Sequence, residues 1–454
     1  MSPTVARDVI DKLHYIDLED GKFTDHTTTT AEDLTNAFNN FDHSPQRSHL
    51  CVFFHGGLTS RADALKTADC LIDGYTKAGA YPFFFIWNSD LLHVLKKEIE
   101  SYAKHPFFVT VANHTVRTVA RKIGVALNKQ ESLKIQKTAA PRTLEQLASF
   151  AKRYDRAWEK HAGTQLGCSS SELDQFALFL LNAEKALPVK RRRFKREKLQ
   201  GDQNPIARIV YRFNTGHDHG LYTTVIEELL IALRLDELGS KLWREMQTFI
   251  EDSFESVPNA GATAFLEHLC AMWEGRPTLR VTLIGHSAGA IYVQRMVEAL
   301  QARLPEGSTL QLEIILLAAA MTFERMNEGL SVLQKRVSGL RVFGLDDEAE
   351  SQDHVIEPPV YDKSLLYLVS SLCDEDPNAD KSLVGMQRYW KDVPPYCDQE
   401  ILAVTKFIGT KRSVWSPTKS GAKPGYRTHA THHGTFPVDP DTNTSVCFVL
   451  KHGF

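Results

Sequence analysis

The sequence predicts an α/β protein, and two strand-to-turn segments lead to this prediction. Residues 280–284 are rich in β-branched and apolar residues, as in a strand, and the glycine-bounded turn Gly285–Gly289 follows them. Apolar residues then recur at helical spacing: Ile291, Val293, Met296, Val297 and Leu300. A second apolar strand, over residues 50–54, ends in His55-Gly56-Gly57-Leu58.

The first turn carries a candidate nucleophile. Its sequence, Gly-His-Ser-Ala-Gly, matches the G-x-S-x-G pattern in which a serine occupies a sharp, strained turn between strand and helix. Glycines at both ends let strand and helix pass closely. The helix N-terminus would direct amide hydrogens at a developing oxyanion. We therefore predict Ser287 as the nucleophile; the alternative is a chance match in an ordinary βα turn.

The second turn suits an oxyanion hole. Glycines after a strand allow backbone amides to approach a substrate carbonyl oxygen with no side chain between them. We expect Gly57 or Leu58 to supply one N–H group and Ala288, directly after the nucleophile, to supply the other. A common glycine-rich turn with no such role is the alternative interpretation.

Together these residues resemble the α/β-hydrolase fold family of serine hydrolases. The resemblance rests on His55-Gly56-Gly57, on Gly285–Gly289 and on a late His-Gly pair, and it covers roughly residues 45–90 and 278–454. It implies a mostly parallel sheet flanked by helices. It also implies a catalytic triad in the chain order serine, acid, histidine, and acyl transfer through a covalent acyl-enzyme.

The acid of such a triad is expected after a later strand. An apolar run at 312–318 predicts a buried strand, a helical stretch covers 323–337, and the strand 340–345 ends in acidic residues. We expect Asp347 to be the acid, with Asp346 as the alternative. Two further carboxylates are weaker candidates: Asp353, and Asp374 after a strand predicted at 365–372.

The base is expected in the histidine-rich segment 428–436. A catalytic histidine belongs on a loop, where one ring nitrogen reaches the serine and the acid holds the other. His433, followed by glycine, is the predicted base, and His432 is the alternative. Clustered histidines also bind metals, but no carboxylate or cysteine lies beside them at ligand spacing, so we expect neither a metal nor a cofactor.

A long segment separates the two strand-to-turn motifs. From His55 to Ser287 there are 232 positions (287 − 55), whereas two βα units need roughly 60–80 residues. We therefore assign 1–90 and 278–454 to the core and 91–277 to a mostly helical insertion. Its expected helices are 91–104, 115–126, 143–158, 170–186, 223–238 and 241–254. The resemblance implies a cap over the active site, which would exclude water and shape the pocket.

A basic run lies inside the insertion. Seven of the nine residues 190–198 are lysine or arginine, which is compatible with an anionic lipid, a nucleic acid or an acidic partner. A solvated linker between Pro188 and Gly201 is the simpler interpretation.

Composition and charge limit the remaining possibilities. The 454 residues are 43% hydrophobic with a net charge of −3, so a sizeable core is expected and no overall attraction to nucleic acid or anionic membrane. No apolar run approaches transmembrane length, and the first residues lack a signal-peptide pattern. Seven cysteines without a C-x-x-C pair, of which Cys51, Cys70 and Cys270 are expected to be buried thiols, favour a reducing, cytoplasmic location.

The sequence therefore predicts a serine hydrolase that cleaves a carboxylic ester or a lipid through an acyl-serine intermediate. An amidase or peptidase with the same triad is one alternative. A catalytically inactive binding or scaffold protein on the same fold is another, although the retained serine, glycines and late histidines argue against it. The sequence does not indicate an oligomeric state.

Overall fold

The computed structural model describes residues 10–87, 89, 92–103, 205–233, 235–356, 360–373 and 380–454, with the single positions 108, 112, 115, 116 and 119. Its centre is one seven-stranded sheet in the order β1-β3-β2-β4-β5-β6-β7. Every neighbouring pair of strands is parallel. The strands are β1 Tyr15–Leu18, β2 His49–Phe54, β3 Tyr81–Trp87, β4 Arg280–His286, β5 Leu312–Leu317, β6 Val337–Leu345 and β7 Ser413–Ser416.

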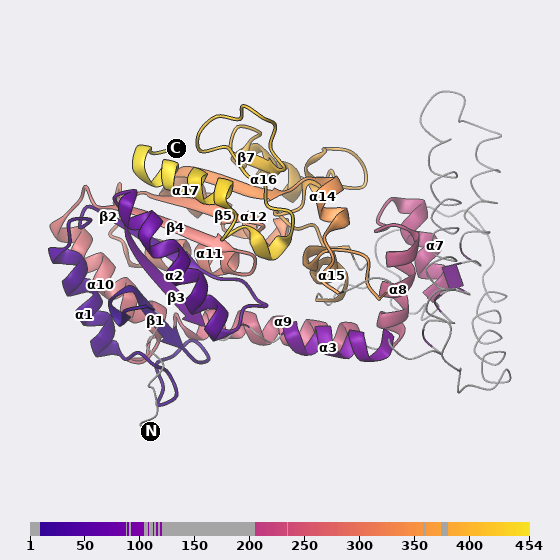
Figure 1. Ribbon diagram of the computed structural model, residues 1–454, viewed down its shortest axis with the longest axis horizontal. Helices are drawn as coiled ribbons and strands as arrows, with labels where there is room; N and C mark the ends of the chain where they lie inside the picture. The colour runs from indigo at the N-terminus through magenta and orange to yellow at the C-terminus, as the bar shows by residue number, and fades with distance from the viewer. Residues whose placement is uncertain are drawn as a thin grey trace, which may run out of the picture.

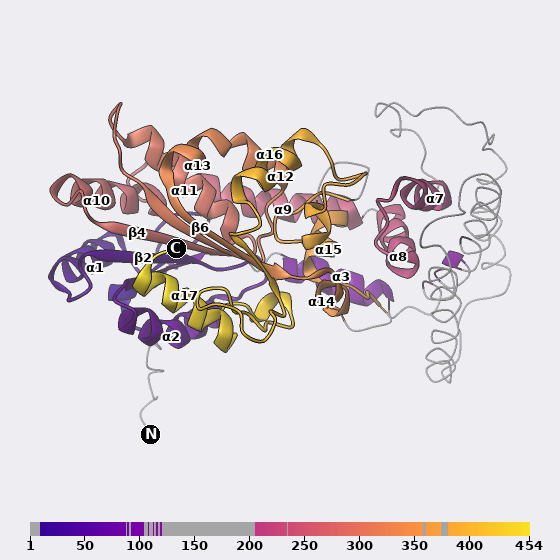
Figure 2. The same cartoon turned by 90° about the horizontal axis from the view of Figure 1, so that it is seen from above.

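Helices cover both faces of this sheet (Figures 1 and 2). Those before the second half of the sheet are α1 Ala31–His43, α2 Arg61–Lys77, α3 Leu92–Ala103, α7 Pro205–Thr215, α8 Leu221–Ala232, α9 Leu235–Asp252 and α10 Gly261–Gly275. The later ones are α11 Gly289–Arg303, α12 Phe323–Glu328, α13 Leu330–Arg336, α14 Asp347–Gln352, α15 Leu365–Leu372, α16 Gln399–Ile408 and α17 Pro440–His452. The predicted α/β fold, with a parallel sheet flanked by helices, is confirmed.

Alternation of side chains along the strands creates two separate cores. In β2, Leu50, Val52 and Phe54 join the larger core, which lies under α1, α10 and α11. Cys51 and Phe53 point to the other face and pack with apolar residues of α2 and α17. Figure 2 shows α2 and α17 together below the sheet, opposite α11 and α13. The side chains of a strand that is buried on both faces are nearly all apolar. This explains the continuous apolar runs at 50–54 and 81–87.

The helices predicted within 91–277 are recovered in part. α3, α8 and α9 correspond to the helices expected at 91–104, 223–238 and 241–254. α7 and α10 were not predicted, and α10 packs against α1 and α11 beside the sheet. The helices predicted at 143–158 and 170–186, most of that at 115–126, and the basic run 190–198 lie outside the described residues.

One predicted strand is wrong. Residues 365–372 form the helix α15, which packs against α9 and does not join the sheet. The Ser364 side chain accepts a hydrogen bond from the backbone N–H of Tyr367 and caps this helix. Short apolar runs of this length are ambiguous because a buried helix segment and a buried strand have the same composition.

A buried network of charges connects α7 and α8 to the segment 361–396. Glu227, fully buried on α8, accepts hydrogen bonds from Arg212 (2.7 Å) and from the Tyr361 hydroxyl (2.7 Å). The two ring nitrogens of His219 lie 2.8 Å from Glu227 and 3.0 Å from Asp380. Buried charges of this kind persist only when paired, so this cluster ties the two segments to each other.

The remaining predictions concern cysteines and membrane helices. Cys51 is buried as expected, but Cys70 is exposed and Cys270 is only partly buried. The expectation of a buried Cys70 thiol is wrong because its position on α2 faces away from the sheet. None of the cysteines in the described ranges forms a disulfide. Within those ranges, no helix has both the length and the apolar character needed to cross a bilayer.

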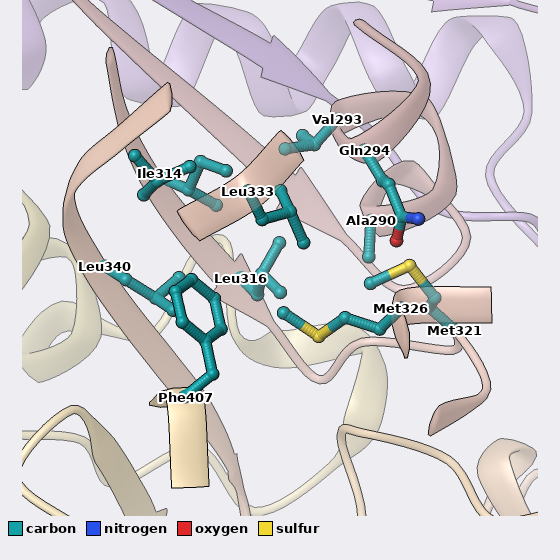
Figure 3. Close-up of a pocket in the computed structure, with 11 residues that line it drawn as sticks. Ala290, Val293, Gln294, Ile314, Leu316, Met321, Met326, Leu333, Leu340 and Phe407 are labelled. Carbon is teal, nitrogen blue, oxygen red and sulfur yellow. The ribbon is translucent and has the colours of Figure 1, made fainter. Parts of the chain in front are cut away.

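A small apolar gap lies behind α11, between that helix and β5 and β6 (Figure 3). Ala290, Val293, Leu316, Met321 and Met326 are among the side chains that border it. Its volume is about 10 Å³, which holds one water at most, and its lining is apolar. It is a packing defect of the core and offers no room for a ligand.

The start of α11 crosses the end of β2 at very short range. A Cβ atom at Gly289 would lie 2.2 Å from the carbonyl oxygen of Phe54 and 2.9 Å from that of His55. Both contacts are with backbone, which cannot move aside without displacing β2. The second glycine of the G-x-S-x-G turn is therefore required by the packing of helix against strand.

This packing predicts opposite effects for the same substitution at two helical glycines. Gly289→Ala is expected to lower the free energy of unfolding by about 1–3 kcal/mol, because the new methyl group overpacks a backbone contact. Gly275→Ala, at the end of α10, meets no atom within 4 Å and is expected to be neutral or stabilising by roughly 0.5–1 kcal/mol. Urea unfolding of both variants measures this; equal effects would contradict the account.

Candidate active site

The turns that follow β2 and β4 meet at the centre of the sheet's carboxyl edge. β2 and β4 are neighbours, yet the chain leaves β2 toward β3 on one side and continues from β4 toward β5 on the other. This reversal is a topological switch point, where loops diverge and leave a crevice in which ligands bind in open α/β sheets. Both motifs singled out from the sequence lie there.

Ser287 adopts the strained backbone expected of a nucleophile turn. Its φ angle is +53°, in the left-handed region that residues other than glycine rarely occupy. Its N–H group donates to the carbonyl of Leu317 (2.9 Å), and its own carbonyl accepts from the N–H groups of Ala290 (3.1 Å) and Ala320 (3.0 Å). Strain of about 1–3 kcal/mol persists only where the surroundings impose it, and these bonds to α11 and the end of β5 do so.

The His55–Thr59 loop packs directly against this turn. A Cβ atom at Gly56 would lie 2.8 Å from the Cβ of Ser287, and one at Gly57 would lie 3.4 Å from the Cβ of Ala288. The N–H groups of Gly57, Leu58 and Ala288 donate no hydrogen bond to any residue that the structure describes. The predicted oxyanion donors are thus brought together with Ser287, and their N–H groups remain available.

Buried side chains fix the shape of this loop. The Ser89 hydroxyl donates to the carbonyl of Gly56 (2.7 Å) and lies 3.3 Å from that of Thr59. His55 accepts from the backbone N–H of Trp87 (3.1 Å) and stacks on the Trp87 ring. Burial lowers the pKa of His55 to about 4, so at neutral pH this ring is an uncharged support. Sequence reasoning did not single out Ser89.

A carboxylate that the sequence ranked low lies at this site. Asp353 is buried after α14, and one of its oxygens lies 3.0 Å from Nδ1 of His432. Its other oxygen accepts from the backbone N–H of His433 at 2.7 Å. Asp353 therefore holds both candidate bases, one through its ring and the other through its main chain.

The two predicted histidines differ in environment. The His432 side chain is 58% exposed, whereas His433 is buried and its ring lies 5.3 Å from the ring of His286. His286 also holds the carbonyl of His433 through Nε2 (3.0 Å). Neither ring nitrogen of His433 has a hydrogen-bond partner among the described residues. Burial lowers the pKa of His433 well below its usual range and that of His286 to about 4.

The two acids ranked first in the sequence lie elsewhere. Asp346 caps α14 by accepting from the backbone N–H of Ala349 (2.8 Å), and Asp347 pairs with Lys391. Neither lines the cavity above Ser287, while Asp353, seven residues beyond Asp346, does. The short helix α14 makes the difference, because it carries the chain back over the strand ends. Asp374 lies outside the described residues.

A cavity of about 380 Å³ joins these groups. Ser287, Asp353, His432 and His433 line it together with Gly56–Thr59. Among the described residues that line it, the aliphatic side chains are those of Leu58, Val355 and Leu365, and neither lysine nor arginine occurs. In the described part of the chain, no group of three or more histidine, cysteine or acidic residues is arranged to hold a metal ion.

No protein-family model, curated protein sequence or solved structure matches this chain significantly. What the site can do is therefore inferred from its geometry and chemistry.

Glu350, one turn before Asp353, is a second buried carboxyl group. Its Oε1 bonds the Ser364 hydroxyl, and its Oε2 has no partner in the described structure. Burial raises its pKa to about 8, helped by the charge of Asp353. Glu350 is therefore uncharged at neutral pH, and Asp353 is the carboxylate that bonds the two histidines.

This raised pKa predicts a pH-dependent effect of Glu350→Gln. The folded state of the wild type binds more protons than the unfolded state between about pH 4.5 and 8, so its stability falls as pH rises through that window. The variant lacks this loss. We expect its melting temperature, relative to wild type, to be higher at pH 8.5 than at pH 4.5; the same difference at both pH values would contradict the assignment.

Proposed function

We propose that this chain is a serine hydrolase that cleaves carboxylic esters through an acyl-Ser287 intermediate. The observation that carries the proposal is a single cavity shared by a strained serine, three backbone N–H groups that bond no described residue, and an Asp353–histidine pair. A nucleophile, a base with an acid partner and donors for an oxyanion are the parts that acyl transfer requires.

The reaction would proceed in two steps, acylation of Ser287 and hydrolysis of the acyl-enzyme. The base takes the proton of the Ser287 hydroxyl as its oxygen bonds the ester carbon, and the oxyanion accepts hydrogen bonds from Ala288 and from Gly57 or Leu58. The carbon–alkoxide bond then breaks, and the leaving alcohol receives the proton from the base. A water molecule, deprotonated by the same base, attacks the acyl carbon; the carboxylic acid leaves, and Ser287 regains its proton.

We assign the base to His433 and the acid to Asp353. A buried ring with two unpartnered nitrogens is costly, and a hydroxyl or a substrate in the cavity would satisfy it. Asp353 already accepts a hydrogen bond from the backbone N–H of His433 (2.7 Å), so the carboxylate lies next to this histidine. Catalysis would require the His433 ring to turn its Nδ1 to this carboxylate when substrate binds. Catalytic hydrogen bonds often form fully only with substrate bound. His432, whose Nδ1 contacts Asp353, is the alternative base.

The lining of the cavity favours short acyl groups over lipid chains. Three aliphatic side chains among the described lining residues offer little surface to a long chain, and they are interspersed with the side chains of His432, His433, His354, Asp353 and Asp63. Esters of short acids are therefore the first substrates to test.

Removal of the nucleophile is the first test. Ser287→Ala is expected to reduce turnover of p-nitrophenyl acetate by about a thousandfold or more, because no acyl-enzyme can form. Ser331→Ala, at an exposed position of α13, is the matched control and should retain wild-type turnover. Equal turnover by wild type and Ser287→Ala, with both proteins folded, would refute the proposed nucleophile.

Three histidine variants from one loop test the base. His433→Ala is expected to lose about 10²–10⁴-fold in kcat, the usual contribution of general base catalysis. His432→Ala should lose less than about tenfold, and His429→Ala, whose ring pairs with Asp441 in solvent, should be unaffected. The larger loss in His432→Ala would transfer the role of base to His432.

The pH profile of kcat/KM gives an independent test of the base. A base must be uncharged to act, and burial holds the pKa of His433 well below its usual range in the free enzyme. We therefore expect kcat/KM to remain constant as pH falls past 6.5 and to decline only at a more acidic pH. A midpoint at 6.5 or above would contradict His433 as the base.

A further inference from the structure

A second cavity, lined by both polar and apolar side chains, lies on the other side of the His55–Thr59 loop. It opens at the carboxyl ends of β1 and β3, and its volume is about 160 Å³. Thr59 lines both this cavity and the one above Ser287. Ser89, which holds the carbonyl of Gly56, lines it as well. A molecule bound at Ser287 could therefore extend across Thr59 into this second space.

Asp17 supplies a buried carboxylate with one open oxygen. Its Oδ2 accepts from the N–H group of Thr28 (2.6 Å) and from the Thr28 hydroxyl (3.0 Å), and pairs with Arg61 (2.9 Å). Its Oδ1 has no hydrogen-bond partner among the described residues, although Asp17 is only 4% exposed and lines the cavity. Oδ1 is not among the fully buried atoms that lack a partner, so it faces the open space of the cavity, where a donor can reach it.

The neighbouring groups of the cavity are also only partly bonded. Arg61, whose side chain is 43% exposed, uses one terminal nitrogen, Nη2, on Asp17 and Thr28, while its Nε and Nη1 make no hydrogen bond with a described residue. Glu19 accepts from the Thr24 hydroxyl at Oε2, and its Oε1 is open. The cavity is therefore lined by both open acceptors and open donors. The acceptors belong to two carboxylates, Asp17 and Glu19, and the donors to one guanidinium, that of Arg61.

This combination indicates what the cavity accepts. Two carboxylates repel an anion, and an apolar chain would leave every open group unpaired. Hydroxyl groups both donate and accept, so adjacent hydroxyls can satisfy Asp17 and Arg61 at once. We propose that this cavity is a subsite for the polyhydroxylated, sugar- or glycerol-like part of an ester whose acyl carbon lies at Ser287. The kinetic consequence rests on the proposed hydrolase function, but binding of the hydroxylated group does not.

Binding is tested first, without turnover. In the Ser287→Ala protein, methyl α-glucopyranoside is titrated and binding is followed by saturation-transfer NMR. Asp17→Asn in the same background is expected to weaken binding about tenfold or more, because Oδ1 loses its charge. Glu19→Gln is the second variant, because the Glu19 side chain bonds no backbone group and its replacement should leave the fold intact. It is expected to weaken glucoside binding several-fold, which keeps the test valid if Asp17→Asn unfolds. Asp73→Asn, at an exposed carboxylate of α2, is the matched control and should bind unchanged.

Kinetics then separate the subsite from the active site. For the protein with Ser287 intact, we expect kcat/KM for 6-O-acetylglucose to exceed that for ethyl acetate at least tenfold. Asp17→Asn should reduce that ratio about tenfold, and Asp73→Asn should leave it unchanged.

Hydrolysis of both esters at equal kcat/KM, with no glucoside binding, would overturn the subsite while the hydrolase stands. Glucoside binding that depends on Asp17, with neither ester hydrolysed, would support the subsite and remove the hydrolase. Binding of ethylammonium in place of the glucoside would overturn the polyol assignment.

Discussion

The left-handed turn at Ser287 is the constraint on which the site depends. It reverses the chain between β4 and α11 within a few residues, so that a Cβ atom at Gly289 would lie only 2.2 Å from the carbonyl oxygen of Phe54 in β2. This close approach brings Ser287 against Gly56 and Ala288 against Gly57. The proposed oxyanion donors and the proposed nucleophile therefore lie together because of one local conformation and the absence of side chains around it, at the point where the strand order of the sheet reverses.

Several of the ionisable side chains around that turn are uncharged at neutral pH. His55, His286 and His433 are buried deeply enough to be uncharged at neutral pH, and Glu350 is kept protonated by its burial. Asp353 is the carboxylate that contacts the two loop histidines. A single carboxylate in such surroundings stabilises a positively charged imidazole more strongly than it would in water, because little solvent screens it.

The sequence was sufficient to predict the sheet and the two turns that meet at Ser287, but it ranked Asp353, the carboxylate that contacts the histidines, below Asp347 and Asp346. Strands buried on both faces leave continuous apolar runs, so 50–54, 81–87 and 280–284 are visible in the sequence, and the glycines of both turns mark the loops between strand and helix. Asp347 directly follows a strand and fitted the expected chain order, whereas Asp353 reaches the histidines only because α14 turns the chain back. That turn depends on Asp346 as a helix cap, which a local pattern does not distinguish from a catalytic acid.

The strand predicted at 365–372 is wrong for a related reason, since Ser364 starts a helix in a segment whose composition fits either structure. Asp17 and Ser89 gave no local signal, because their importance comes from contacts with residues distant in the chain.

The most direct measurement of the central claim is the site of covalent modification by a serine-directed organophosphate. After reaction of the folded protein with diisopropyl fluorophosphate, tryptic digestion releases the peptide 281–295, which contains Ser287 and ends at Arg295. The proposed nucleophile predicts one diisopropylphosphoryl group per chain, located by fragmentation at Ser287. A folded protein that stays unmodified under conditions that label other serine hydrolases, or one that is modified at a different residue, would contradict it.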